Sequence, residues 1–129
     1  MAIHQMKLAI APFGKIVRGE KIIESRLYDK KRQEINPADQ IEFTCNDEET
    51  KKVLIKVRAL YRYADFESLF SDFTSTYFGG ASKEELVKEM ETFYLKEDQK
   101  KYGVIAGALL GVINYEIVSV RLLRLVPYR

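Results

Sequence analysis

The side chains with the clearest chemical potential stand close together in the segment GEKIIESR. It contains Gly19, Lys21, Glu24 and Arg26, at a point where a short helix is expected to give way to a strand. An arginine offers a planar fork of donors to a phosphate or to a base edge, and a lysine adds a point charge. In an ideal strand Lys21 faces away from Glu24 and Arg26, so the three converge only if Lys21 lies in the turn or a bulge intervenes. Convergence predicts a cleft for a nucleotide-like ligand, and the alternative is an exposed ion-pair cluster worth about 0 to 1 kcal/mol.

Other catalytic groups are scarce. The one histidine is His4 and the one cysteine is Cys45, so neither a Ser-His-Asp set, a Cys-His set nor a structural zinc site is expected. We therefore expect no metal and no cofactor. Any hydrolysis would rest on Lys21 and Glu24, and Lys21 is a base only if burial lowers its pKa more than the nearby Glu24 raises it.

Further candidate ligand contacts are cations and tyrosines. The cations that can form a basic rim beside the cleft are Lys15, Arg18, Lys30, Lys31 and Arg32. Such a rim would hold phosphate, although a run of charges is more often a solvated turn. Tyr63 and Tyr102 can stack an unpaired base, or they can pack into the core.

The composition bounds the class of protein. The chain has 129 residues, 47% hydrophobic and 31% charged, which fits one domain over residues 1–129. The 21 basic and 19 acidic residues give a net charge of +2, which excludes neither a basic nor an acidic partner. A single cysteine favours a reducing, cytoplasmic setting, and the longest apolar run, residues 103–113, is too short to span a membrane.

The hydrophobic pattern predicts a sheet with inserted helices. Strands are expected at residues 7–11, 21–27, 40–45 and 53–61 and in the C-terminal tail. Helices are expected from Pro12, after Asp65 as N-cap, and after Ser82, which forms a capping box with Glu85. We therefore predict an α+β fold in which five or six short, mostly antiparallel strands form a small barrel with about three short helices inserted.

The GEKIIESR segment resembles the GxKxxExR signature of ASCH domains, the activating-signal-cointegrator homology family. All the fixed positions match, and the likeness extends through RLYDKKRQ, DQIEF, residues 63–70, SKEEL and Tyr102-Gly103-Val104. It covers residues 6–113, whereas residues 114–129 look like an additional C-terminal strand or tail. The resemblance implies a PUA-like β-barrel, with the signature lining a cleft that binds RNA or a nucleotide.

Some small bacterial members of this family look like amidohydrolases that act on acylated cytidine. In those members the signature lysine is paired with a threonine three positions later and with a downstream glutamate. This chain has Glu24 at the threonine position and no acid in residues 76–81, so Glu84 or Glu85 would have to supply the second group.

Three functions follow from these observations. The first is RNA or nucleotide binding through Lys21, Glu24 and Arg26, in which Arg26→Ala weakens binding and leaves thermal stability nearly unchanged. The second is an amidohydrolase in which Lys21 is the base or nucleophile and Glu24 orients it. The third is an interaction module that forms a homo-oligomer through the tail at residues 115–129.

Overall fold

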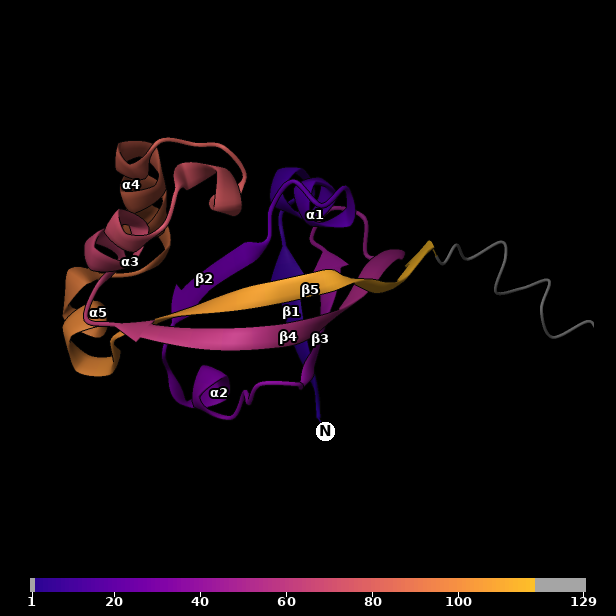
Figure 1. The fold of residues 1–129 in the computed structure, drawn as a ribbon, viewed down its shortest axis with the longest axis horizontal. Coiled ribbons are helices and arrows are strands. Elements are labelled where there is room, and N and C mark those ends of the chain that lie inside the picture. Colours follow the sequence, from indigo (N-terminus) through magenta and orange to yellow (C-terminus); the bar gives the residue numbers. More distant parts are fainter. Residues whose placement is uncertain (1, 118–129) are drawn as a thin grey trace, which may run out of the picture.

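The computed structural model describes residues 2–117, and its centre is a five-stranded sheet that curls into a half-barrel (Figure 1). The strands are β1 (Ile3–Leu8), β2 (Ile23–Leu27), β3 (Gln40–Cys45), β4 (Lys51–Tyr63) and β5 (Val104–Ile117). Their order in the sheet is β1-β3-β4-β5-β2, with β1 and β3 parallel and the other pairs antiparallel. The α+β class is confirmed.

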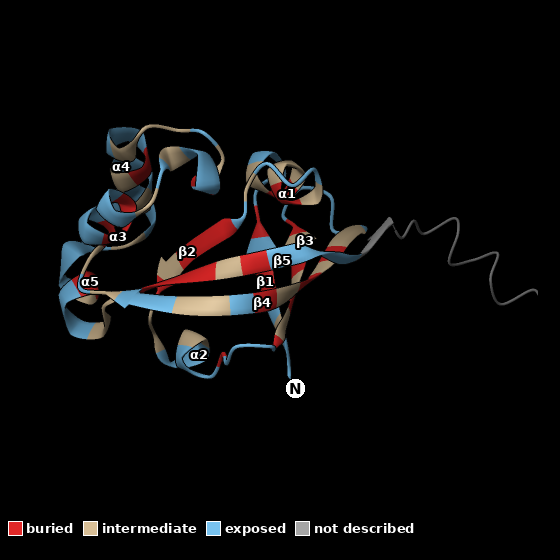
Figure 2. Ribbon diagram, in the orientation of Figure 1, coloured by how far each residue is buried: buried red, intermediate tan, exposed pale blue. Residues whose placement is uncertain are grey.

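Alternating side chains build the centre of the sheet. Val53, Ile55 and Val57 of β4 are buried, and the residues between them are partly exposed. The antiparallel pairing predicted for β3 and β4 is confirmed, with Phe43 opposite Val53. Figure 2 shows that buried residues also dominate β2, the strand that carries Glu24 and Arg26, and the first part of β5.

Helices pack around the sheet in the described part of the chain (Figure 1). They are α1 (Ile10–Val17), α2 (Lys30–Gln33), α3 (Phe66–Asp72), α4 (Lys83–Phe93) and α5 (Lys96–Tyr102), with a 3₁₀ turn at Ser75–Phe78. The predicted caps are confirmed: Asp65 accepts from the Ser68 amide at 2.8 Å, and Ser82 and Glu85 form the capping box. No helix within residues 2–117 is long and apolar enough to cross a membrane.

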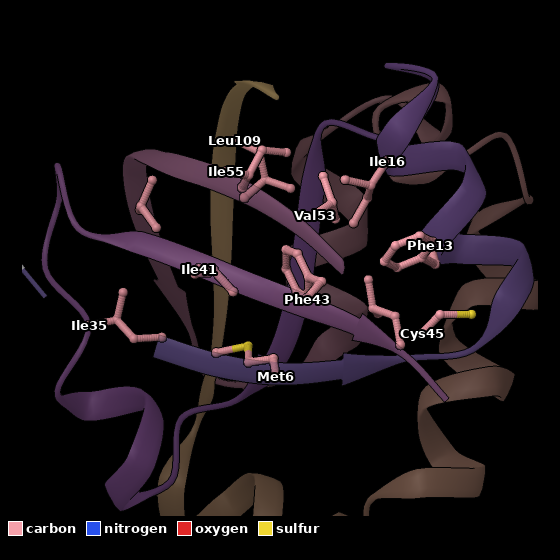
Figure 3. Close-up of a cluster of buried hydrophobic side chains, with 12 residues drawn as sticks. Met6, Phe13, Ile16, Ile35, Ile41, Phe43, Cys45, Val53, Ile55 and Leu109 are labelled. Carbon is pink, nitrogen blue, oxygen red and sulfur yellow. The ribbon is translucent and has the colours of Figure 1, made fainter. Parts of the chain in front are cut away.

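The apolar core has two parts. One lies between the strands and α1, where Phe13 and Ile16 pack toward Phe43 and Val53 (Figure 3). The other joins α3 and α4 to β2 and β5, and its members include Phe66, Leu86, Ile23 and Val104. The second part holds α4 beside β2, which forms the cleft described below.

The structure corrects three details of the sequence-based fold. Residues 2–117 contain five helices rather than about three. The two that were missed are α2, a single turn capped by Asp29, and α5, a charged helix with no apolar stripe to reveal it. The first strand and helix begin earlier than expected, so Pro12 is the third residue of α1. Backbone pairing does not close the barrel, because β1 and β2 are the edges of the sheet within the described residues. Of the additional strand or tail predicted for residues 114–129, residues 114–117 continue β5, and residues 118–129 lie outside the described residues.

One glycine offers a direct test of this fold. Gly103 ends α5 at φ +71°, and a Cβ there would lie 3.0 Å from the carbonyl oxygen of Tyr63. Gly103→Ala is therefore expected to lower the free energy of unfolding by about 1–3 kcal/mol. The control is Gly111→Ala, where an added Cβ meets nothing within 4 Å. Urea unfolding that gives equal losses for the two variants would contradict the placement of Gly103.

Candidate functional site

The turn between α1 and β2 positions the first signature residue. Gly19 adopts φ +75° just after α1, a left-handed conformation that glycine takes at little cost. The chain then folds back, so that the amides of Glu20 and Lys21 donate to the Lys15 carbonyl at 2.8 and 3.2 Å. Lys21 thus lies in the turn, two residues before the strand begins at Ile23. This is the arrangement under which Lys21 can meet the strand residues that follow.

Glu24 lies between two cations. Its Oε1 is 2.8 Å from Lys21 Nζ, and its Oε2 accepts from Arg26 Nε at 2.7 Å. The exposed fractions of the three side chains are 6% for Glu24, 11% for Lys21 and 16% for Arg26. The signature is therefore a buried ion-pair network rather than an exposed cluster.

Arg26 also connects the two edges of the sheet. Its Nη2 donates to the carbonyl oxygen of Lys7 at 2.8 Å, so a β2 side chain bonds to the β1 backbone. Loss of Arg26 would break this contact and leave Glu24 with one partner. The geometry therefore replaces the sequence-based expectation that Arg26→Ala leaves thermal stability nearly unchanged, because removing one partner of a buried ion pair is strongly destabilising.

The charges set the protonation state of the network. Burial alone would raise the pKa of Glu24, but the charges and hydrogen bonds of Lys21 and Arg26 outweigh it and lower that pKa to about 2. Burial likewise opposes the charge of Arg26, whereas Glu24 and Tyr94 together raise the pKa of the guanidinium. Glu24 is thus an ionised acceptor at neutral pH.

A cleft of about 420 Å³ opens beside this network. One wall carries Lys21, Glu24 and Arg26, and the opposite wall is α4, which contributes Met90, Phe93 and Tyr94. The Phe93 side chain is 67% exposed although it lies at a cavity. The cleft thus has one polar, hydrogen-bonding wall and one largely apolar, aromatic wall.

The ionisable groups at the cleft nearly balance. Lys7, Lys21 and Arg26 oppose Glu24 and Glu89, which gives 3 − 2 = +1. Lys21 has three N–H donors and Arg26 has five, so donors remain after the bonds to Glu24 and Lys7. This arrangement suits a neutral or singly anionic ligand with several acceptors.

The other sequence-predicted contacts do not line the cleft. Lys30 and Lys31 are exposed on α2, which lies across the sheet from α1 and α4 in Figure 1, and Arg32 is paired with Asp29 at 2.9 Å. Tyr63 packs edge-on against Phe73.

Tyr102 is the last residue of α5 and is also absent from the cleft. Lys15 donates to the Gly79 carbonyl at 2.8 Å, and Arg18 pairs with Glu20. The expected basic rim beside the cleft is therefore not formed.

The cleft includes residues that sequence reasoning assigned elsewhere. Met90, Phe93 and Tyr94 form the apolar stripe that predicts α4, and the stripe alone does not show that its C-terminal end meets β2. The acid on this helix that lines the cleft is Glu89. Glu85 instead accepts from the Ser82 amide in the capping box. The sequence did carry one signal, because Phe93 and Tyr94 are consecutive aromatics at the end of this helix. Neighbouring residues of a helix cannot both face the apolar core, so one of the two rings must point away from it.

Acid is expected to remove the contribution of Glu24 to stability. Its pKa falls from the ordinary value of 4.5 to about 2 on folding, so this contribution is complete above pH 4.5 and is lost as the pH falls toward 2. Glu24→Gln cannot titrate, and it removes the anion that pairs with the largely buried Lys21 and Arg26. We expect it to lose about 3–5 kcal/mol at neutral pH and to show a shallower decline in acid, measured by urea unfolding.

Two groups serve as references in that experiment. Asp39 also has its pKa lowered to about 2, by hydrogen bonds from His4 and from the amides of Asn36 and Ala2, and it titrates in both proteins. Glu89→Gln removes an exposed acid at the same cleft and should keep the wild-type pH profile. Identical acid dependence in wild type and Glu24→Gln would contradict the network.

Comparisons with known proteins identify the family. The ASCH domain model matches residues 6–111. The solved structure of the hypothetical protein PH0355 is 34% identical, with a TM-score of 0.76 over 88% of this chain and 100% of that one. Protein PF0455 from Pyrococcus furiosus is 30% identical, with a TM-score of 0.68 over 88% and 99% of the two chains.

A more distant structure agrees in fold. ASCH from Zymomonas mobilis is 14% identical, with a TM-score of 0.54 over 98% of this chain and 80% of that one. Among curated proteins no match is found. The family match spans most of the chain, and the fold is a PUA-like half-barrel, whereas the resemblance implied a barrel. The chain therefore belongs to the ASCH domain family.

Proposed function

We propose that the protein binds an unpaired nucleotide of RNA, or a ligand of that size, in the cleft between β2 and α4. The observation that carries the proposal is the pairing of a buried cationic wall with an exposed aromatic wall across about 420 Å³. That volume lies in the range of about 300–1,000 Å³ typical of small-molecule sites. RNA is the class of partner that the family suggests.

The polar wall supplies recognition of oxygen acceptors. Glu24 fixes the positions of Lys21 and Arg26, and their remaining N–H groups can donate to a base carbonyl or to a phosphate oxygen. Because both cations share one carboxylate, the wall carries an excess of a single positive charge. That excess favours one phosphate together with a neutral base over a densely charged ligand.

The aromatic wall supplies stacking. Sequence-specific RNA recognition uses unpaired bases laid on aromatic side chains, and Phe93 offers an exposed ring at the cleft. Met90 and Tyr94 extend the apolar surface below it. In this proposal Phe93 takes the stacking role that the sequence suggested for Tyr63 and Tyr102, because neither tyrosine lines the cleft.

The amidohydrolase alternative rests on the contact between Lys21 and Glu24. Lys21 Nζ is 2.8 Å from Glu24, and a lysine base would have to pass its proton to a neighbour such as that carboxylate. A pKa of about 2 makes Glu24 a poor proton acceptor near neutral pH. The electrostatics therefore favour binding over hydrolysis.

If Phe93 stacks on a base, removal of its ring should cause a measurable loss of affinity for RNA. Phe93→Ala is expected to weaken binding of a short single-stranded RNA by about 5- to 150-fold, because base stacking on an aromatic contributes about 1–3 kcal/mol. Fluorescence anisotropy with a labelled RNA measures the effect. Leu95→Ala is the matched control, since Leu95 is 65% exposed, close to the 67% of Phe93, and does not line the cleft. Equal affinities for the two variants would exclude stacking at Phe93.

Incubation with acylated cytidines separates binder from hydrolase. We expect that the wild type releases no acyl group, as measured by mass spectrometry. We also expect Lys21→Ala to bind RNA more weakly than Lys15→Ala does. Lys15 is a suitable control because it donates to the Gly79 carbonyl and does not line the cleft. Turnover that disappears in Lys21→Ala and persists in Lys15→Ala would overturn the binding proposal in favour of the hydrolase.

A further inference from the structure

A second basic surface lies at the C-terminal end of β4. There a shallow hollow of about 430 Å³ is lined by Arg62 and Tyr63 of β4 and by Lys100, Lys101 and Tyr102 of α5, among others. Three of the residues that line it are cations and none is an acid. The hollow shares no lining residue with the cleft between β2 and α4.

The cations of this surface form no ion pair in the part of the chain that the structure describes. Among residues 2–117, no salt bridge involves Arg62, Lys100 or Lys101. Lys21 and Arg26 in the cleft, by contrast, both pair with Glu24. A hollow whose lining holds three cations and no acid attracts a polyanion, and the release of counterions makes such binding sensitive to salt.

Aromatic rings accompany these cations. The Arg62 guanidinium lies 4.3 Å from the centre of the Tyr28 ring, and Lys101 Nζ lies 5.1 Å from that of Tyr102. Tyr28 stands two residues before α2, and the exposed Lys30 and Lys31 at the start of that helix follow it in the chain. Of the sequence-predicted contacts that are absent from the cleft, Tyr63 and Tyr102 line the hollow.

The sheet connects this surface to the cleft. Arg26 of β2 pairs with Ile105 of β5, and Ile105 pairs with Arg62 of β4. Arg26 and Arg62 thus stand at the same level, two strands apart, which places their Cα atoms about 10 Å from each other. A short RNA segment can span that distance.

We propose that the surface formed by Arg62, Lys100 and Lys101, extended by Lys30 and Lys31, binds the sugar-phosphate backbone of the RNA strand whose base enters the cleft. This inference rests on the proposed function for the identity of the ligand. The cleft reads one base, and the basic surface binds phosphates without regard to sequence.

The test compares two double variants that each remove two positive charges. Lys100→Gln/Lys101→Gln alters the proposed surface, and Lys56→Gln/Lys88→Gln removes two lysines that have no salt bridge among the described residues and lie outside the hollow. The probes are a single-stranded RNA of about twelve nucleotides, an abasic oligomer of equal length that keeps the phosphates, and a mononucleotide. Affinity is measured across a series of salt concentrations, and melting temperatures verify folding.

We expect the Lys100→Gln/Lys101→Gln variant to bind the RNA and the abasic oligomer at least about tenfold more weakly, with a slope of log affinity against log salt that is smaller by about 1.4. Its affinity for the mononucleotide should stay unchanged. The control variant should match the wild type with every probe.

The outcomes separate this inference from the proposed function. Equal salt slopes for the two variants, or a wild type that does not bind the abasic oligomer, would overturn the basic surface. Loss of abasic binding in Lys100→Gln/Lys101→Gln, together with no mononucleotide binding by the wild type, would support the surface and overturn the role of the cleft.

Discussion

The structure around the site depends on one buried carboxylate. Glu24 is taken out of water, and this is tolerable only because Lys21 and Arg26 hold both of its oxygens. Arg26 then reaches from β2 to the Lys7 carbonyl on β1, so the same network joins the two edge strands of a sheet that backbone pairing does not close. The signature residues stabilise the seam of the half-barrel, and in the proposed function the remaining donors of Lys21 and Arg26 also bind the ligand.

This dual role explains why the spacing of the signature matters. Gly19 permits the left-handed turn that places Lys21 ahead of the strand, and Glu24 and Arg26 share one face of β2 because they are two residues apart. Lys21 can then approach Glu24 from the turn while Arg26 approaches it along the strand. The α4 helix completes the site from a distant part of the sequence, since the apolar stripe that packs it against α3 and β2 also brings Phe93 to the cleft.

Much of the fold could be predicted from the sequence, whereas part of the topology and of the candidate site could not. The alternation in β3 and β4 and the capping signals at Asp65 and Ser82 depend on neighbours in the chain, and these elements appear as expected. The parallel pairing of β1 with β3 and the exposure of Phe93 depend on contacts between residues far apart in sequence, which periodicity does not encode. For the same reason the charges of Lys30 and Lys31 were visible in the sequence, but their separation from the cleft was not.

The central claim is that a base enters the cleft between β2 and α4. Titration of the ¹⁵N-labelled protein with a mononucleotide, followed by amide chemical shifts, tests it most directly. The account predicts that the largest changes fall on Lys21 to Arg26 and on Met90 to Tyr94, with Lys100 and Lys101 little affected. Changes confined to other residues, or no change at saturating concentrations of the mononucleotide, would contradict it.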